Sequence, residues 1–345
     1  MNDITHPLTT TAHASQQTNH TTLTLIQAIT AALRWELEHN PRVILLGEDI
    51  GINGGVFRAT DGLQQRFGSQ RVIDTPLDEV SIAGLSIGLA SQGMVPVAEA
   101  QFDGFVYPML DQIICHAARL RNRTRGRLSC PMVLRFPCGA GIHAPEHHGE
   151  MNEVFFAHVP GIRVVMPSSP QRAYGLLLAA IRDPDPVIFM EPKRIYRATK
   201  ELVCEDGAAL PLDVSFVLRS GSDVTLVSWG ACLKETLEAA ELLSTQGVEA
   251  QVIDVATLSP LDFTTIAESI MQTGRCVIVQ EAPRSSGFGA EIAARIAEEC
   301  MHSLLAPVQR VAGYDTHVPL FRLETHYIPS VERIIDAVQK AMDYR

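Results

Sequence analysis

The chain has 345 residues, of which 46% are hydrophobic, and its formal net charge is -11. This length and apolar content allow a large buried core and favour two domains over one. The acidic balance, with no block of like charges, argues against nucleic acid or an anionic membrane as a partner. The longest apolar helix candidate, near 80–94, is too short and interrupted to span a bilayer.

The first 21 residues are polar and rich in Thr and His, and we expect them to form a disordered tail. They contain no Lys or Arg and no long apolar run, so they resemble neither a secretion signal nor a mitochondrial presequence. The seven cysteines are widely spaced, without a C-x-x-C pair. This pattern favours a reducing compartment, and we expect a cytoplasmic protein.

Short β-branched runs then alternate with helical periodicity, which predicts a mainly parallel sheet covered by helices. The first helix is the plainest, because its apolar pattern ends at Asn40-Pro41, a strong helix stop. The expected helices are 23–39, 79–92, 108–123 and 170–182. The expected strands lie within RVILLGEDI, VPVAEAQF, PMVLRFP, RVVMPSS and PVIFMEP.

The alternation lapses over 201–220, which we expect to be a linker, and then resumes to the C-terminus. The sequence therefore predicts the α/β class, with two three-layer domains over 22–200 and 221–345.

A histidine-rich stretch, FPCGAGIHAPEHHGE at 136–150, contains the H-x-x-E-H pattern of one class of zinc hydrolase between His143 and His147. That pattern binds zinc only on a helix, where residues four apart share a face. Pro145 lies inside the motif and glycines surround it, which argues against a helix. Zinc hydrolysis remains an alternative, whereas a glycine-rich loop after a strand suits a ligand site at the carboxyl end of a parallel sheet.

A second motif, Gly287-Phe288-Gly289, follows a predicted strand and opens a helix, as in a dinucleotide-binding fingerprint. Ile292 stands in place of the third glycine, and no strand ending in an acid follows at the usual distance. An ordinary glycine-rich turn is the favoured interpretation, with an NAD-binding oxidoreductase as the alternative.

An acid at the start of an apolar helix is more informative. Pro76 closes an extended run, and Asp78 and Glu79 fall in the first turn of the next helix. Such an acid is ordinarily a surface carboxylate that complements the helix dipole. Here the helix is almost entirely apolar or small, and no basic residue lies nearby in sequence. We therefore expect Glu79 to be partly buried, as a carboxyl that hydrogen-bonds a ring nitrogen of a heteroaromatic ligand.

Seven segments, spread from about residue 22 to residue 344, form a recognisable series. They are LLGEDIG, GGVFRATDGL, RVIDTPLDE, QFDGFVYPMLDQI, APEHHGE, MPSSPQRAYGLLLAAIRDPDPVIFMEPKRIYR and EAPRSSGFGAEIAARIAEE. In order and spacing they resemble the β subunit of the thiamine-diphosphate-dependent decarboxylase component of 2-oxo acid dehydrogenase complexes. The resemblance implies a transketolase-like pyrimidine-binding domain followed by a transketolase C-terminal-like domain.

It also implies a cofactor, thiamine diphosphate, shared with an α subunit in an α₂β₂ assembly. The assembly would decarboxylate a 2-oxo acid and acylate the lipoyl group of a dihydrolipoyl acyltransferase. Glu79 corresponds to the activating glutamate, which promotes the imino tautomer of the pyrimidine and so the deprotonation of the thiazolium carbon. His148 corresponds to the histidine that handles the reacting carbonyl or the lipoyl group.

Other positions carry over from the resemblance one at a time. Leu77 and Gln101 correspond to residues that line the pyrimidine pocket, Phe105 to the aromatic packed on the ring, and Glu48 to an acid near the cofactor. Taken alone, Phe105 would be a core residue and Glu48 a surface acid at a strand end. His143 and His147 stand where many relatives carry other residues, and Gly149 replaces a common serine.

Many members of the family also bind a potassium ion among main-chain carbonyls and an acid. The corresponding residues here are Met132, Val133, Ala180, Asp183 and Asp185. Asp183 and Asp185 also suit an ordinary turn, and the sequence leaves both interpretations open.

The diphosphate end of the cofactor needs a magnesium site of the form G-D-G followed by asparagine. The chain has no G-D-G, and its last asparagine is Asn152. We therefore expect magnesium to bind in the α subunit and the isolated chain to be inactive. The segment APEHH resembles the pyruvate enzymes of Gram-positive type, which implies pyruvate rather than branched-chain 2-oxo acids as the substrate. A non-catalytic β chain stays an alternative.

Overall fold

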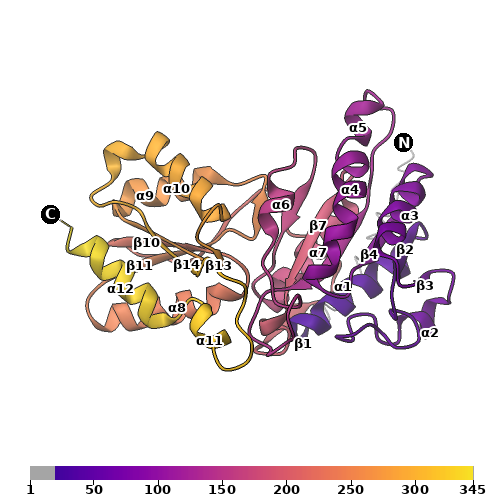
Figure 1. Ribbon diagram of the computed structural model, residues 1–345, viewed down its shortest axis with the longest axis horizontal. Helices are drawn as coiled ribbons and strands as arrows, with labels where there is room; N and C mark the ends of the chain where they lie inside the picture. The colour runs from indigo at the N-terminus through magenta and orange to yellow at the C-terminus, as the bar shows by residue number, and fades with distance from the viewer. Residues whose placement is uncertain (1–19, 345) are drawn as a thin grey trace, which may run out of the picture.

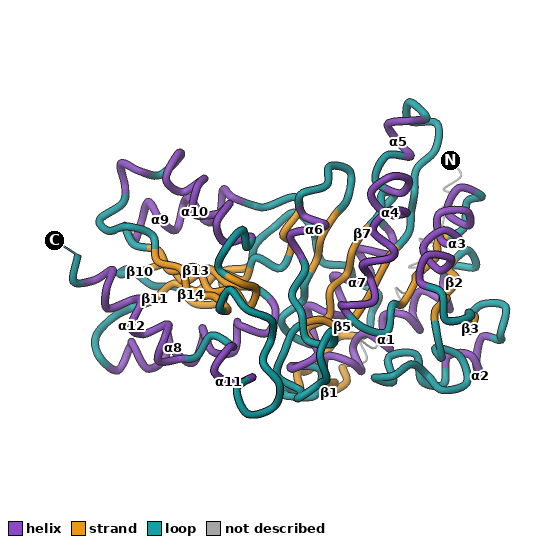
Figure 2. Tube along the Cα trace, in the orientation of Figure 1, coloured by secondary structure: helices purple, strands orange, loops and turns teal. Residues whose placement is uncertain are grey.

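The computed structural model describes residues 20–344, in two α/β domains that lie side by side (Figure 1). The tail expected over 1–21 lies outside the described residues except for its last two, which begin strand β1 (His20–Thr24). The expected class of two helix-covered sheets is confirmed (Figure 2).

The first domain contains a seven-stranded sheet in the order β12-β6-β7-β5-β4-β2-β3. All neighbouring pairs are parallel except β12 with β6. Its strands are β2 (Val43–Gly47), β3 (Val72–Asp74), β4 (Val95–Glu99), β5 (Val133–Cys138), β6 (Arg163–Val165), β7 (Val187–Pro192) and β12 (Thr257–Ser259). The central strands are buried along their whole length, as expected for a sheet covered on both faces.

Separate apolar clusters cover the two faces of this sheet. Helices α1 (Leu25–His39) and α7 (Pro170–Arg182) pack together in one, and α3 (Glu79–Ser91) belongs to the other. Helix α7 has the predicted bounds, and α1 begins after Thr24, whose side chain accepts a hydrogen bond from the Gln27 amide at 3.4 Å. The sheet is therefore the middle layer of three.

The single helix expected over 108–123 is wrong. The chain instead forms a series of short helical segments, with Pro108 inside the first. Proline cannot donate a backbone hydrogen bond, which favours interruption of a regular α-helix. The segments are the 3₁₀ helix η1 (Asp103–Met109), α4 (Leu110–Gln112), the π-helix η2 (Ile113–Ala117) and α5 (Leu120–Arg123).

The second domain has a five-stranded sheet in the order β14-β13-β10-β11-β9, parallel except for the β11–β9 pair. Helices α9 and α10 lie on one side of it and α8 and α12 on the other (Figure 1). The strands are β9 (Phe216–Arg219), β10 (Val224–Ser228), β11 (Ala250–Asp254), β13 (Cys276–Pro283) and β14 (Gln309–Gly313). The helices are α8 (Leu233–Thr245), α9 (Phe263–Thr273), α10 (Phe288–Glu299), α11 (Glu324–Tyr327) and α12 (Val331–Met342).

The segment expected as a linker, 201–220, contains strands at both ends. Strand β8 (Lys200–Cys204) pairs antiparallel with β1, and β9 joins the second sheet. In addition, β12 follows β11 in the chain but extends the sheet of the first domain. One apolar cluster runs from Met166 in the first domain to Trp229 in the second, so the domains share a core.

The remaining short helices are α2 (Leu63–Phe67), α6 (Glu153–Ala157), η3 (Lys193–Ile195), η4 (Gly230–Cys232) and η5 (Met301–Ser303).

Candidate active site

The residues predicted to bind the cofactor or to act in catalysis follow four neighbouring parallel strands. Glu48 comes directly after β2, Glu79 comes after β3 and Gln101 after β4, and the histidine-rich segment follows β5. These strands are adjacent in the order β5-β4-β2-β3. Because the carboxyl ends of parallel strands meet at one edge, the fold brings these segments to the same edge of the first sheet, where α/β proteins bind ligands.

Two carboxyl groups lie close together at this edge. Glu48 is 5% exposed, and its Oε1 atom has no hydrogen-bond partner among the described residues. Burial and the negative charges of Glu79 and Asp49 raise the pKa of Glu48. Glu79 is half-buried as the first residue of α3. An unsatisfied buried oxygen beside a second carboxyl is a binding position for a polar ligand.

Two large apolar side chains close in sequence to this pair are exposed to solvent. Leu77 is 81% exposed and Ile52 is 87% exposed. Gln101 lies closer to the core and is half-buried, with its Nε2 atom 3.5 Å from Asp49 Oδ2. Large apolar side chains with this exposure indicate a surface that another molecule covers.

His148 lies among aromatic side chains. Its ring makes edge contacts with Phe102 and Phe105, at centroid distances of 4.4 and 5.1 Å. Its Nδ1 atom is 2.9 Å from the carbonyl oxygen of Glu146, which acts as the acceptor. In a neutral ring this hydrogen bond keeps the proton on Nδ1 and leaves Nε2 as the acceptor for a ligand.

The other two histidines of the segment have different partners. His143 Nδ1 is 3.1 Å from Glu324 Oε2, and His147 Nδ1 is 3.7 Å from Glu150 Oε1. His143 and His147 have positive φ, 57° and 71°, so the motif does not form the helical turn that zinc hydrolases use. No group of three His, Cys, Asp or Glu side chains among the described residues is arranged to hold a metal ion.

The Gly287-Phe288-Gly289 turn accommodates a glutamine. Gln280 Oε1 accepts from the Gly289 amide at 2.7 Å, and Gln280 Nε2 donates to the Pro283 carbonyl at 2.8 Å. A Cβ atom on Gly287 would lie 1.9 Å from Gln280 Nε2. The glycines therefore make room for the Gln280 side chain. Its hydrogen bond uses the Gly289 amide at the start of the helix, which the phosphate of a dinucleotide would need as a donor.

The residues that correspond to a potassium site cluster at the other end of the sheet. The carboxylates of Asp183 and Asp185 each pair with an arginine, Arg163 at 2.8 Å and Arg121 at 2.6 Å. The carbonyl of Met132, just before Val133, accepts from Val187, and that of Ala180 accepts from Asp183. These groups thus have the partners of an ordinary turn.

Buried charges beneath the site were missed from the sequence. Arg135, 2% exposed on β5, pairs with Glu99 on β4 and with both carboxylate oxygens of Glu191 on β7. The signal was a single charged residue in each of three otherwise apolar strand runs. Charges in fully buried strands are retained only when they are paired.

Comparisons with known proteins agree with this arrangement. The family model described as "Transketolase, pyrimidine binding domain" matches residues 21–199, and "Transketolase, C-terminal domain" matches residues 215–334. A pyruvate dehydrogenase E1 component subunit beta from Acholeplasma laidlawii is 45% identical over 92% of this chain and 97% of its own length. The chain belongs to the transketolase-like E1 β-subunit family.

Two further relatives define the range of this E1 β-subunit family. The Bacillus subtilis pyruvate dehydrogenase E1 component subunit beta is 44% identical, covering 93% of this chain and 99% of its own. A 3-methyl-2-oxobutanoate dehydrogenase subunit beta of Mycobacterium tuberculosis is 46% identical, covering 93% and 92%. A solved structure titled "Split gene transketolase, inactive beta4 tetramer" has a TM-score of 0.75, with 22% identity, and covers 93% of this chain and 99% of that one, which shows the shared fold.

E1 enzymes of this family use thiamine diphosphate. No described helix is long and apolar enough to cross a membrane.

Proposed function

We propose that this chain supplies the pyrimidine-binding half of a thiamine diphosphate site in a 2-oxo acid dehydrogenase. One observation carries the proposal. The Glu48 and Glu79 carboxyl groups lie at the strand-end edge of the first domain, with an unsatisfied Glu48 oxygen. The residues present fit an aminopyrimidine, which offers ring nitrogens and an amino group to carboxyls and a flat face to apolar side chains.

In this proposal, Glu48 is the acid near the cofactor and Phe105 packs on its pyrimidine ring. Glu79 holds a proton in a hydrogen bond to the pyrimidine ring nitrogen, and Gln101 and Leu77 orient the ring. When bound, the cofactor supplies the electron sink for the electrons released by decarboxylation. His148, kept in place by Phe102 and Phe105, moves a proton at Nε2 to or from the reacting carbonyl or the lipoyl group.

An α subunit completes the site. The chain lacks the G-D-G motif for magnesium and diphosphate, and the exposed Leu77 and Ile52 supply an apolar surface for a second polypeptide. We propose an α₂β₂ assembly with magnesium in the α subunit. This assembly transfers the acyl group to a lipoyl-bearing acyltransferase. Binding of potassium by Asp183 and Asp185 would require their arginine partners to move. The proposed reaction therefore does not depend on a potassium ion.

The proposed substrate is pyruvate, and 3-methyl-2-oxobutanoate is the second candidate because relatives of both kinds are 44–46% identical. Turnover of the two acids by the chain co-purified with its α subunit separates them. A preference of at least about tenfold for 3-methyl-2-oxobutanoate would overturn the first choice, because one or two methylenes in an apolar pocket change specificity by about 10–200-fold.

The test of the proposed site is Glu79→Gln in the co-assembled enzyme. The variant should still bind thiamine diphosphate, measured by calorimetry, but its 2-oxo acid turnover should fall by about 10²–10⁴-fold. Glu299→Gln, which removes an exposed carboxylate paired with Arg295 in the second domain, is the matched control. Near-normal turnover of Glu79→Gln would contradict the assigned role.

A further inference from the structure

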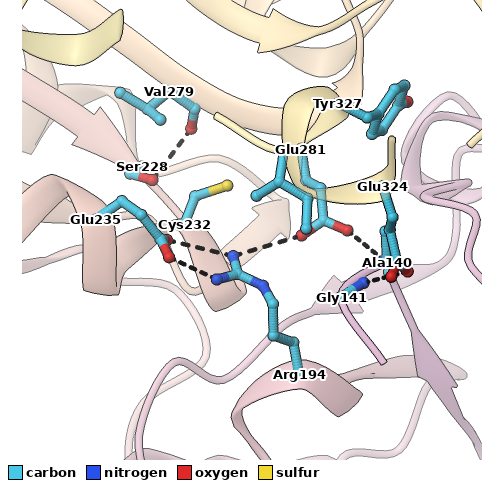
Figure 3. A network of polar contacts seen from close by, with 12 residues as sticks. Ala140, Gly141, Arg194, Ser228, Cys232, Glu235, Val279, Glu281, Glu324 and Tyr327 are labelled. Carbon is cyan, nitrogen blue, oxygen red and sulfur yellow. Dashed lines mark hydrogen bonds and ion pairs between the residues drawn. The ribbon is translucent and has the colours of Figure 1, made fainter. Parts of the chain in front are cut away.

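The histidine loop, defined as residues 139–152, is bound by carboxylates of the second domain. Glu281 Oε1 accepts from the Ala140 amide at 2.5 Å. Glu324 Oε1 accepts from the Gly141 amide at 2.7 Å, and Glu324 Oε2 accepts from the His143 amide at 2.9 Å. Figure 3 shows both carboxylates reaching the start of the loop from the second domain. Three loop amides are thus satisfied by residues far away in the sequence.

The two carboxylates are buried and need these donors. Glu281, on β13, and Glu324, at the start of α11, are each 3% exposed. Glu281 also lies 3.8 Å from Arg194 Nη2, whose guanidinium makes two hydrogen bonds with Glu235 (Figure 3). The His143 ring also contacts Glu324, with Nδ1 3.1 Å from Oε2. A buried carboxylate is stable only when its oxygens are hydrogen-bonded, so Glu324 depends on the loop as the loop depends on it.

The backbone of the loop is shaped to bind such an anion. Gly139, Gly141 and His143 have positive φ values of 84°, 97° and 57°. Successive residues with mixed-handed backbone turn their N–H groups to one side and form an anion-binding concavity. A Cβ atom on Gly141 would lie 2.2 Å from the Arg194 Cδ atom, so no other residue fits there without a shift. This concavity binds the protein's own carboxylate.

The chain before Glu324 also packs over the loop. Val318 Cγ1 would lie 3.6 Å from a Cβ atom on Gly149, and the rings of Phe321 and His143 are 6.2 Å apart. Near its two ends the loop is closed on itself, since Gly139 donates to the Glu150 carbonyl at 2.9 Å. Between these ends, the second domain contacts the loop at Gly141, His143 and Gly149.

We propose that Glu324 is a positioning residue, which fixes the backbone at Gly141 and His143 and thereby places His148 for the reaction. It touches no reacting atom. The second domain thus takes part in catalysis by setting the loop of the first. That the loop serves 2-oxo acid turnover rests on the proposed function, whereas the anchoring of the loop by Glu324 does not.

The test uses Glu324→Gln and Glu324→Ala in the chain co-assembled with its α subunit, and Glu299→Gln as the control. A glutamine has one acceptor oxygen and one donor nitrogen, so it keeps the size of Glu324 but loses one of the two loop amides. Backbone hydrogen exchange is measured on peptides covering the histidine loop and on peptides of the second-domain sheet. The kcat and KM for the 2-oxo acid are measured on the same preparations.

For Glu324→Gln we expect the loop peptide that contains Gly141 and His143 to exchange one of these amides at least tenfold faster, with unchanged exchange in β10 and β13. We also expect kcat to fall at least tenfold with a smaller change in KM. Glu324→Ala should show larger changes in the same direction, and the control none. Unchanged loop exchange, or equal loss of protection throughout the second domain, would overturn the proposal. Faster loop exchange with normal kcat would also overturn it. If the unmodified assembly turns over no 2-oxo acid, the proposed function fails, and the exchange data alone decide the anchoring.

Discussion

The ammonium group of Lys193 lies 3.2 Å from Asp103 Oδ2, and neither side chain is exposed to solvent. The same carboxylate oxygen accepts from the Gly139 amide at 3.2 Å, while the Asp103 carbonyl accepts from Asn152 Nδ2 at 2.9 Å. Asp103 therefore contacts both ends of the histidine loop. Burial raises the pKa of Asp103, and the charge of Lys193 opposes that rise.

Lys193→Met tests this ion pair. The substitution leaves the Asp103 carboxylate buried without its counter-charge, and we expect the free energy of unfolding to fall by about 3–5 kcal/mol. Adding Asp103→Asn to the same chain should recover much of this loss, because the uncompensated charge is removed. Urea denaturation of the single and double variants measures both effects. A loss below about 1 kcal/mol in Lys193→Met would show that the pair contributes little.

Gly104→Ala should displace the histidine loop, because the added methyl group would clash with His147. A Cβ atom at this position would lie 2.2 Å from the His147 carbonyl oxygen and 2.8 Å from its ring. Because backbone atoms cannot move aside easily, we expect at least a tenfold loss of 2-oxo acid turnover in the co-assembled enzyme, of the size that small misplacements of reacting groups produce.

The matched glycine variant is Gly88→Ala, in helix α3, where an added Cβ meets no atom within 4 Å. It should raise the free energy of unfolding by about 0.5–1 kcal/mol, since alanine is the better helix former. If Gly104→Ala turns over substrate normally, the close approach of Gly104 to His147 is not needed for activity.

Glu153 makes the stability depend on pH. It is completely buried, neither carboxylate oxygen has a hydrogen-bond partner among the described residues, and burial raises its pKa to about 7. The unfolded chain ionises this group near the ordinary glutamate pKa of 4.5, whereas the folded chain keeps it protonated until about 7. Stability should therefore decrease as pH rises through this window, by on the order of 3 kcal/mol.

Glu153→Gln should remove this dependence. Below about pH 4 the variant and the unmodified protein should differ little, because the carboxyl is protonated in both the folded and unfolded states. At pH 8 the variant should melt at the higher temperature. Melting temperatures recorded from pH 5 to pH 8 give the two slopes, and parallel slopes would mean that Glu153 is already hydrated or paired in solution.

The isolated chain should be inactive. It has no G-D-G motif to bind magnesium and diphosphate, so decarboxylation of pyruvate or 3-methyl-2-oxobutanoate should appear only after the α subunit is added. The experiment compares the purified chain with and without the α subunit at equal thiamine diphosphate and magnesium. Decarboxylation by the chain alone would contradict a site shared between two polypeptides.

Local patterns were sufficient for much of the fold and for the position of one candidate site residue in it. The period of the apolar residues predicted α7 with its observed bounds, and the acid pattern placed Glu79 at the start of α3. The prediction of one helix over 108–123 was wrong because the apolar period does not reveal the 3₁₀ helix that contains Pro108 or the π-helix that follows it. The place of Glu79 in the chain suggested a carboxyl that hydrogen-bonds a ring nitrogen, the resemblance suggested the activating glutamate, and both stay predictions.

The anchoring of the histidine loop could not be read from the sequence. Glu281 and Glu324 lie 141 and 183 positions from the amides that they accept from. Such contacts depend on how two sheets pack, and no local period records that. Strand β12 was missed for the same reason, since three residues inside the second domain become a strand of the first sheet only after the domains meet.

Strand β12 comes from the second half of the chain but pairs in the sheet of the first half, so the two halves depend on each other. Thr257 and Ser259 pair with Val165 and Val164, and this pairing covers the border strand β6. A cut between the halves would expose a row of free N–H and C=O groups along β6, a template on which further copies can add. Separate expression of residues 20–204 should therefore yield aggregates rather than a working module, and fusion or truncation schemes should keep both halves on one polypeptide.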